Sequence, residues 1–278
     1  MHASRNRQPS ALLGVIFFSA LLSVSAVEAP SAPAVEELQR LRSKFSALLL
    51  QKAEPGEWRE IEKAFQELAT KYPRDAAVRA GFGEFLWERG ERDGAMREWK
   101  VAEELDPRNA AVLYRLGDAH LAAGSGKSAA RYFQKACAAA PTVAQFRYAA
   151  GNTTFLFRHE LVDASQTEDQ VLAVALAHFA TAVRLAPLDG EYARAYAETF
   201  YGMKMPDWTE AIEAWRHVLE IGPNKDFACA NLARVNLKAG QYGASLAWLE
   251  KIQSADYERL KSTLRTQIEA ALKAKGEP

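Results

Sequence analysis

The string GSGKS at residues 124–128 has the composition of a phosphate-binding loop, in which backbone N–H groups wrap a nucleotide phosphate. The complete signature places another glycine five positions before Gly126, where this chain has Leu121. Such a loop also follows a buried strand, whereas residues 110–123 are rich in alanine and have the pattern of a helix. The sequence therefore predicts a turn at GSGKS, with no nucleotide bound there.

Other residue types that do chemistry are scattered. The two cysteines, Cys137 and Cys229, each lie among alanines in a predicted helix and are expected to be buried free thiols, although an exported chain could join them in a disulfide. No serine stands in a nucleophile elbow, and the histidines show no metal-ligand spacing. The histidines are His2, His120, His159, His178 and His217. We expect no catalytic site, metal or cofactor, and therefore no enzyme.

The composition narrows the class of protein further. The 278 residues include 35 basic and 35 acidic side chains, so no net charge attracts the chain to nucleic acid or to an anionic membrane. Alanine is abundant, and β-branched residues never alternate with polar ones for long. This pattern predicts an all-helical protein whose partners are not nucleic acids.

The N-terminus has the pattern of a signal peptide, predicted over residues 1–26. Arg5 and Arg7 precede an apolar stretch, and small residues end it at Ala26, where cleavage is expected. Residues 27–34 have the Ala/Pro composition of a flexible linker. We expect an exported protein, periplasmic or secreted. The alternative is an uncleaved segment that anchors the chain, which would be its sole contact with a membrane.

Glycines and prolines recur with a period that explains GSGKS. Gly83, Gly117 and Gly151 are separated by 34 residues each, and Pro73, Pro107 and Pro141 have the same spacing. A glycine such as Gly90 or Gly124 ends a first helix, a second helix follows, and a proline ends the repeat. Each mid-helix glycine is expected where another helix passes closely. Residues 124–128 are therefore predicted to join two helices of one repeat.

At these residues the sequence resembles the tetratricopeptide repeat family, whose helix–turn–helix units are 34 residues long. The resemblance extends over residues 35–257, as five to six repeats with insertions near residues 155–170 and 202–209. Residues 258–278 are expected to form a capping helix with a polar outer face. The resemblance implies an all-α, right-handed superhelical solenoid.

The resemblance also implies a non-enzymatic scaffold that binds a partner protein or peptide on the concave face formed by the first helices. Two alternatives stay open: a non-catalytic or weakly active subunit of an envelope enzyme complex, and a carrier of peptides or small ligands. The lysine and asparagine pattern with which some family members hold a C-terminal carboxylate is absent. By helical phase, the outward residues of the first helices are Glu84, Tyr114, Asp118, Tyr148, Asn152, Arg194, Glu198, Tyr201 and Arg234.

The second insertion adds Met205 and Trp208 to the candidate binding residues. Methionine and tryptophan in a turn would offer an adaptable apolar contact at the edge of the solenoid, next to the first insertion. The alternative is that they pack on each other or cover that edge.

Overall fold

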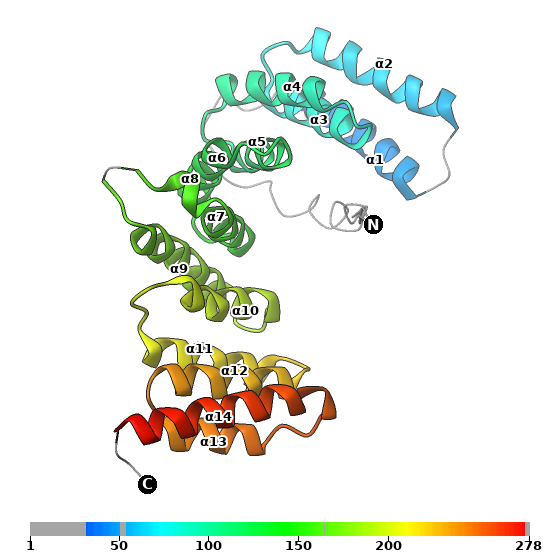
Figure 1. Ribbon diagram of the computed structural model, residues 1–278. Helices are drawn as coiled ribbons and strands as arrows, with labels where there is room; N and C mark the ends of the chain where they lie inside the picture. The colour runs from blue at the N-terminus through cyan, green and yellow to red at the C-terminus, as the bar shows by residue number, and fades with distance from the viewer. Residues whose placement is uncertain (1–31, 51–53, 164, 276–278) are drawn as a thin grey trace, which may run out of the picture. The chain divides into compact units, whose positions relative to one another are not determined.

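The computed structural model describes residues 32–50, 54–163 and 165–275, which contain fourteen α-helices (Figure 1). The only β-type pairing in these ranges is an isolated bridge between Asp163 and Gln166, so the predicted all-α class is confirmed. The predicted signal peptide lies outside the described residues. The helices are α1 (Ala32–Leu50), α2 (Pro55–Lys71), α3 (Ala76–Glu88), α4 (Arg92–Leu105), α5 (Ala110–Ala122), α6 (Gly126–Ala139), α7 (Ala144–Leu156), α8 (Arg158–Leu161), α9 (Glu168–Leu185), α10 (Gly190–Thr199), α11 (Trp208–Ile221), α12 (Lys225–Lys238), α13 (Tyr242–Glu250) and α14 (Glu258–Lys275).

The helix α1 begins earlier than the sequence predicted. Residues 32–34, which were expected to belong to the Ala/Pro linker, form its first turn. Pro33 is compatible with this position, because the first turn of a helix needs no N–H donor there and proline has the required φ angle.

The chain divides into two compact units, one ending at Ala119 and the other beginning at His120. In the N-terminal unit, α3 packs on α4 and α1 packs on α2. The ring of Trp99 in α4 is almost fully buried, and its Nε1 donates a hydrogen bond to the carbonyl of Ala80 at 3.2 Å. A Cβ on Gly83 would lie 2.5 Å from this ring, so glycine is what lets Trp99 pack against the backbone of α3.

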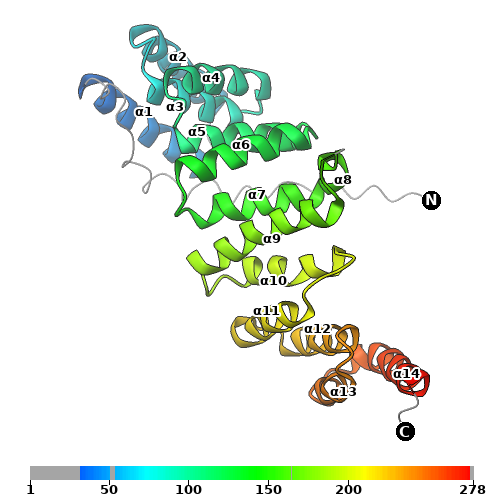
Figure 2. The same ribbon diagram turned by 90° about the vertical axis from the view of Figure 1, so that its left-hand side faces the viewer.

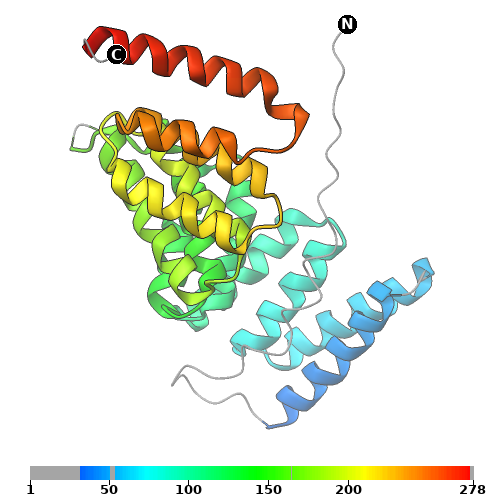
Figure 3. The ribbon, with the colours of Figure 1, turned by 90° about the horizontal axis from the view of Figure 1, so that it is seen from below.

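In the C-terminal unit, helices pack in successive pairs, α7 with α9, α10 with α11, and α12 with α13 (Figure 2). Gly151 of α7 repeats the arrangement at Gly83, since a Cβ there would lie 2.9 Å from the ring of Phe179. The last helix, α14, runs beside α12 and α13 and buries Leu264 and Ile268 against them (Figure 3). Its other residues are mostly exposed.

Three of the first helices end at a glycine in the left-handed region, as the sequence predicted. The φ angles are +82° at Gly90, +71° at Gly124 and +73° at Gly240. After each glycine the next N–H bonds back to a helix carbonyl, for example Ser125 to His120 at 2.8 Å. The predicted turn at GSGKS is confirmed, because α6 starts at Gly126 and Lys127 is exposed.

Two connections between first and second helices are longer than the others. The first runs from Leu156 to Glu168 and contains the single-turn helix α8. Its end is fixed by a capping box, in which Thr167 accepts from the N–H of Gln170 and the Gln170 side chain accepts from the N–H of Thr167. The second runs from Thr199 to Trp208, and the Asp207 carboxylate caps α11.

Candidate functional site

The GSGKS turn is covered by another part of the chain. The ring of Phe157, at the start of α8, packs on Gly126 so closely that a Cβ there would lie 2.2 Å from its Cγ and Cδ1 atoms. A phosphate at the start of α6 would need the space over this backbone, which the aromatic ring occupies. Gly126 therefore provides a packing surface for the first insertion.

Reactive side chains do not converge in the described residues. Among these residues, no three His, Cys, Asp or Glu side chains come together in a way that could hold a metal ion. Cys137 and Cys229 are both free and buried, as predicted, and burial raises the pKa of Cys137 to about 11 and also raises the pKa of Cys229. Both thiols are therefore protonated at neutral pH and unreactive.

The predicted site residues of the N-terminal unit form a partly buried charged group. Glu84 of α3 pairs with Arg115 of α5 at 3.4 Å. Burial raises the pKa of Asp118, one turn further along α5, to about 6, and the positive charge of Arg115 opposes this shift. Tyr114 on the same helix is half-buried.

In the C-terminal unit, Tyr148 joins two first helices. Its hydroxyl donates a hydrogen bond to Glu191 at 2.6 Å, and its ring stacks on Tyr192 with 4.7 Å between centroids. Burial, followed by the Glu191 carboxylate, raises the pKa of Tyr148. Asn152, one turn further along α7, is half-buried. The sequence predicted Tyr148 and Asn152 but not Glu191 or Tyr192.

A second network joins α10 and its extension to α12. The hydroxyl of Tyr201, in the 3-10 turn Phe200–Gly202, donates to the side-chain oxygen of Asn231 at 3.2 Å. Arg234 donates to the same oxygen at 3.4 Å. The other two predicted residues, Arg194 and Glu198, form an ion pair with each other along α10 at 3.6 Å.

The residue that unites this second network, Asn231, was missed in the sequence. It is buried, and its amide donates to the carbonyl of Phe227 one turn earlier at 3.0 Å. Asparagine is a weak helix former. The only feature of the sequence that could have indicated a role for Asn231 is its position directly before the core residues Leu232 and Ala233. A buried asparagine in a helix needs a polar partner, which Tyr201 and Arg234 supply here.

The two insertions lie side by side, as the sequence predicted. The Asp169 carboxylate, in the first turn of α9, accepts hydrogen bonds from the N–H groups of Lys204 and Met205 at 3.1 and 3.2 Å. A Cβ on Gly202 would lie 3.6 Å from the ring of Phe155, so α7 also reaches the second insertion. We call this surface, made of residues 155–163, 165–169 and 202–208, the insertion edge.

The predicted apolar residues of the insertion edge differ in exposure. Met205 is 87% exposed, while its backbone is held by Asp169. Trp208 is half-buried and packs on the core around Trp215. The ammonium group of Lys238 lies over the Trp208 ring, 5.6 Å from its centroid. Met205 thus has the exposure expected of a contact residue, whereas Trp208 is largely part of the core.

Comparisons with known proteins agree with this geometry. Residues 86–144 match the tetratricopeptide repeat family. Among solved structures, YrrB, a TPR protein with an unusual peptide-binding site, superposes with a TM-score of 0.58 and 22% identity, covering 74% of this chain and 99% of YrrB. The described chain has the tetratricopeptide-repeat fold. PilF of Pseudomonas aeruginosa has a TM-score of 0.55 and 14% identity over 83% of this chain and 99% of its own. MamA has a TM-score of 0.50 and 20% identity over 65% of this chain and 96% of its own. No curated protein matches the chain.

Tetratricopeptide repeats are in general protein-interaction scaffolds without chemistry of their own. Within the described ranges, no helix of the repeat fold is both long and apolar enough to cross a membrane.

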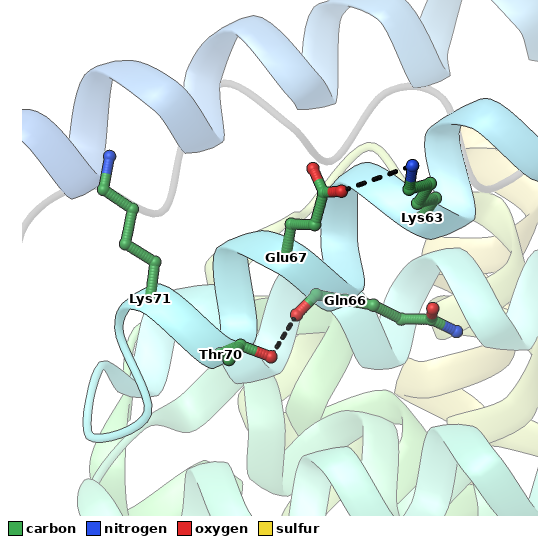
Figure 4. A pocket seen from close by; sticks show the side chains of 5 residues that line it. All are labelled: Lys63, Gln66, Glu67, Thr70 and Lys71. Atoms are coloured by element: carbon green, nitrogen blue, oxygen red, sulfur yellow. Dashed lines mark hydrogen bonds and ion pairs between the residues drawn. The ribbon is translucent and has the colours of Figure 1, made fainter.

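A shallow hollow lies on the exposed side of α2, lined by Lys63, Gln66, Glu67, Thr70 and Lys71 (Figure 4). These side chains already have partners: Lys63 pairs with Glu67 at 3.7 Å, and Lys71 pairs with Glu37 of α1 at 2.7 Å. A single helix face lined by paired polar groups offers little enclosed surface to a ligand. The first helices of the C-terminal unit are therefore the better candidate.

Proposed function

We propose that this chain is a non-enzymatic scaffold that binds an extended segment of a partner protein on the first helices α10 and α12. The network of Tyr201, Asn231 and Arg234 carries this proposal. Its donors and acceptors are held in place by one another, so binding a peptide costs little side-chain entropy. Tyrosine and arginine are also the side chains that most often dominate binding energies at interfaces.

The similarity to YrrB supports a peptide as the ligand, since that protein is described as having a peptide-binding site. An accessible asparagine such as Asn152 suits this ligand because its amide offers both a donor and an acceptor to a peptide backbone. Asn152 of α7, which is half-buried and lies one turn after Tyr148, would extend the same surface along the C-terminal unit.

The proposal includes export to the periplasm or the medium, on the basis of the signal-peptide pattern in residues 1–26. Expression of the full chain in a bacterium, followed by N-terminal sequencing of the protein from the periplasmic fraction, tests this part. We expect the mature chain to begin at Val27. An intact N-terminus in the membrane fraction would instead favour the uncleaved anchor.

Binding is tested with the full chain on a peptide array that samples many sequences. We expect a subset of the peptides to bind. Tyr201→Phe combined with Arg234→Gln should weaken the binding of those peptides at least about tenfold, because both side chains that donate to Asn231 are altered. The matched control is Arg184→Gln, which removes the same charge from the exposed side of the second helix α9. Binding that is unaffected by the double variant, or weakened equally by the control, would refute the proposed surface.

A further inference from the structure

Two basic side chains occupy the exposed face of α12. Arg234 and Lys238 are both exposed and lie one helical turn apart. No carboxylate of the described residues pairs with either, whereas Arg194, Arg216 and Arg265 of the same unit each pair with a glutamate. Like charges at this spacing repel each other, and no carboxylate in the described ranges offsets the repulsion between these two.

Neutral groups hold both cations in place. The Arg234 guanidinium donates to the Asn231 oxygen at 3.4 Å, and the Lys238 ammonium lies 5.6 Å from the centroid of the Trp208 ring. Neither contact neutralises the charge, and both leave N–H donors free. Glu198 of α10, whose charge acts on Tyr201, is itself paired with Arg194. Arg234 and Lys238 therefore present two positive charges on α12 that no ion pair within the described part of the chain neutralises.

We propose that Arg234 and Lys238 bind two acidic side chains at alternate positions of an extended partner segment. This inference rests on the proposed function and specifies the partner's chemistry. Four residues of a helix rise about 6 Å, and alternate side chains of an extended chain are about 6.6 Å apart on one face. The two cations thus have the spacing of an acidic–x–acidic sequence. A single C-terminal carboxylate would engage only one of them.

The apolar side chains near the two cations indicate that the partner segment also contains an apolar residue. Trp208 lies beneath Lys238, and the exposed Met205 belongs to the same connection between α10 and α11. An apolar residue next to the acidic pair would contact this part of the insertion edge, where methionine can adapt to its shape. The partner segment is therefore acidic and apolar in close succession.

Fluorescence anisotropy with the full chain and labelled, capped peptides tests the proposal. The probe is acetyl-GEIEFG-amide, and its neutral counterpart is acetyl-GQIQFG-amide. We expect the acidic peptide to bind at least about tenfold more tightly than the neutral one at low salt, and to weaken as salt is added. Replacing both cations, Arg234→Gln and Lys238→Gln, should remove this difference. The control, Arg184→Gln with Arg259→Gln, removes two exposed charges elsewhere in the unit and should leave it unchanged.

Three outcomes would overturn the proposal. They are equal binding of the two peptides, acidic binding that survives loss of both cations, and equally tight binding of GQIQF with a free C-terminal carboxylate. The proposed function would still be supported after any of these results if peptides on the array bound the parent and if Tyr201→Phe with Arg234→Gln weakened that binding. Because Arg234 and Lys238 are exposed, the charge-removing variant should keep the parent's melting temperature, so a loss of binding reports on the surface itself.

Discussion

Replacing Gly126 with alanine is expected to undock the first insertion from the start of α6. The new Cβ would lie 2.2 Å from two atoms of the Phe157 ring, far inside van der Waals contact, so the ring must move. Phe157 is half-buried, and full burial of a phenylalanine is worth about 1.5–3 kcal/mol. Once the ring has left its place nothing further is lost, so the cost should be limited to about 1–2 kcal/mol.

A double-variant cycle tests this steric reasoning by urea denaturation and thermal melting. Gly126→Ala, Phe157→Ala and the combination should all lower the free energy of unfolding by nearly the same amount, because each abolishes one shared contact. For a chain of this size, 1 kcal/mol corresponds to about 2–4 °C in melting temperature. Gly190→Ala is the matched control. It also changes the first residue of a helix, but its Cβ would meet nothing within 4 Å, so stability should hold or rise.

Additive losses in the double variant would show that Gly126 and Phe157 act separately. A Gly126→Ala protein as stable as the parent would show that the insertion does not pack on this turn in solution. Either result would refute the reasoning.

Four other expectations follow from contacts described above. Lys127→Ala should leave the melting temperature unchanged because the side chain is exposed, and calorimetry should detect no stoichiometric ATP or GTP binding to the parent. Asp169→Asn should cost about 1 kcal/mol and speed hydrogen exchange at the amides of Lys204 and Met205, whereas unchanged exchange would argue against the carboxylate bridge. Burial raises the pKa of Asp118 to about 6, so the folded state favours the protonated carboxyl group. The stability that protonation of Asp118 adds should be complete below about pH 4 and lost as the pH rises through 6. Asp118→Asn should flatten this part of the curve of stability against pH. Cys137 and Cys229 should resist thiol reagents in the native protein at pH 7. After unfolding without a reductant, labelling should detect two thiols per chain, and a smaller number would indicate a disulfide.

The repeat pattern was readable in the sequence because backbone geometry restricts its key positions. Only glycine easily adopts the left-handed conformation found at Gly90, Gly124 and Gly240, and only glycine fits beneath Trp99 at Gly83. Such positions recur at a fixed spacing even where the surface residues differ from repeat to repeat. The helices and the adjacency of the two insertions could therefore be predicted.

The contacts between neighbouring repeats could not be predicted in the same way. Helical phase predicts that Tyr201 and Arg234 point outward, but their meeting at Asn231 depends on how two helices are rotated against each other. The same holds for Phe157, which belongs to the first predicted insertion and packs on Gly126. The environment of Trp208 was harder still to predict, because its ring both packs on the core and lies under Lys238.

The carboxylate of Asp169 has a counterpart in Asp226, the second residue of α12, which accepts hydrogen bonds from the N–H groups of Gln253 and Ser254 at 3.1 and 2.7 Å. In a repeat protein, stability is approximately the sum of what each repeat contributes alone and what each boundary between neighbours adds. These two bridges, with Phe157 on Gly126, strengthen the boundary contributions. Strong coupling between neighbours makes partly unfolded states rare, so the helices from α6 to α13 should melt in one transition, and cutting the chain within them should destabilise repeats well beyond the cut.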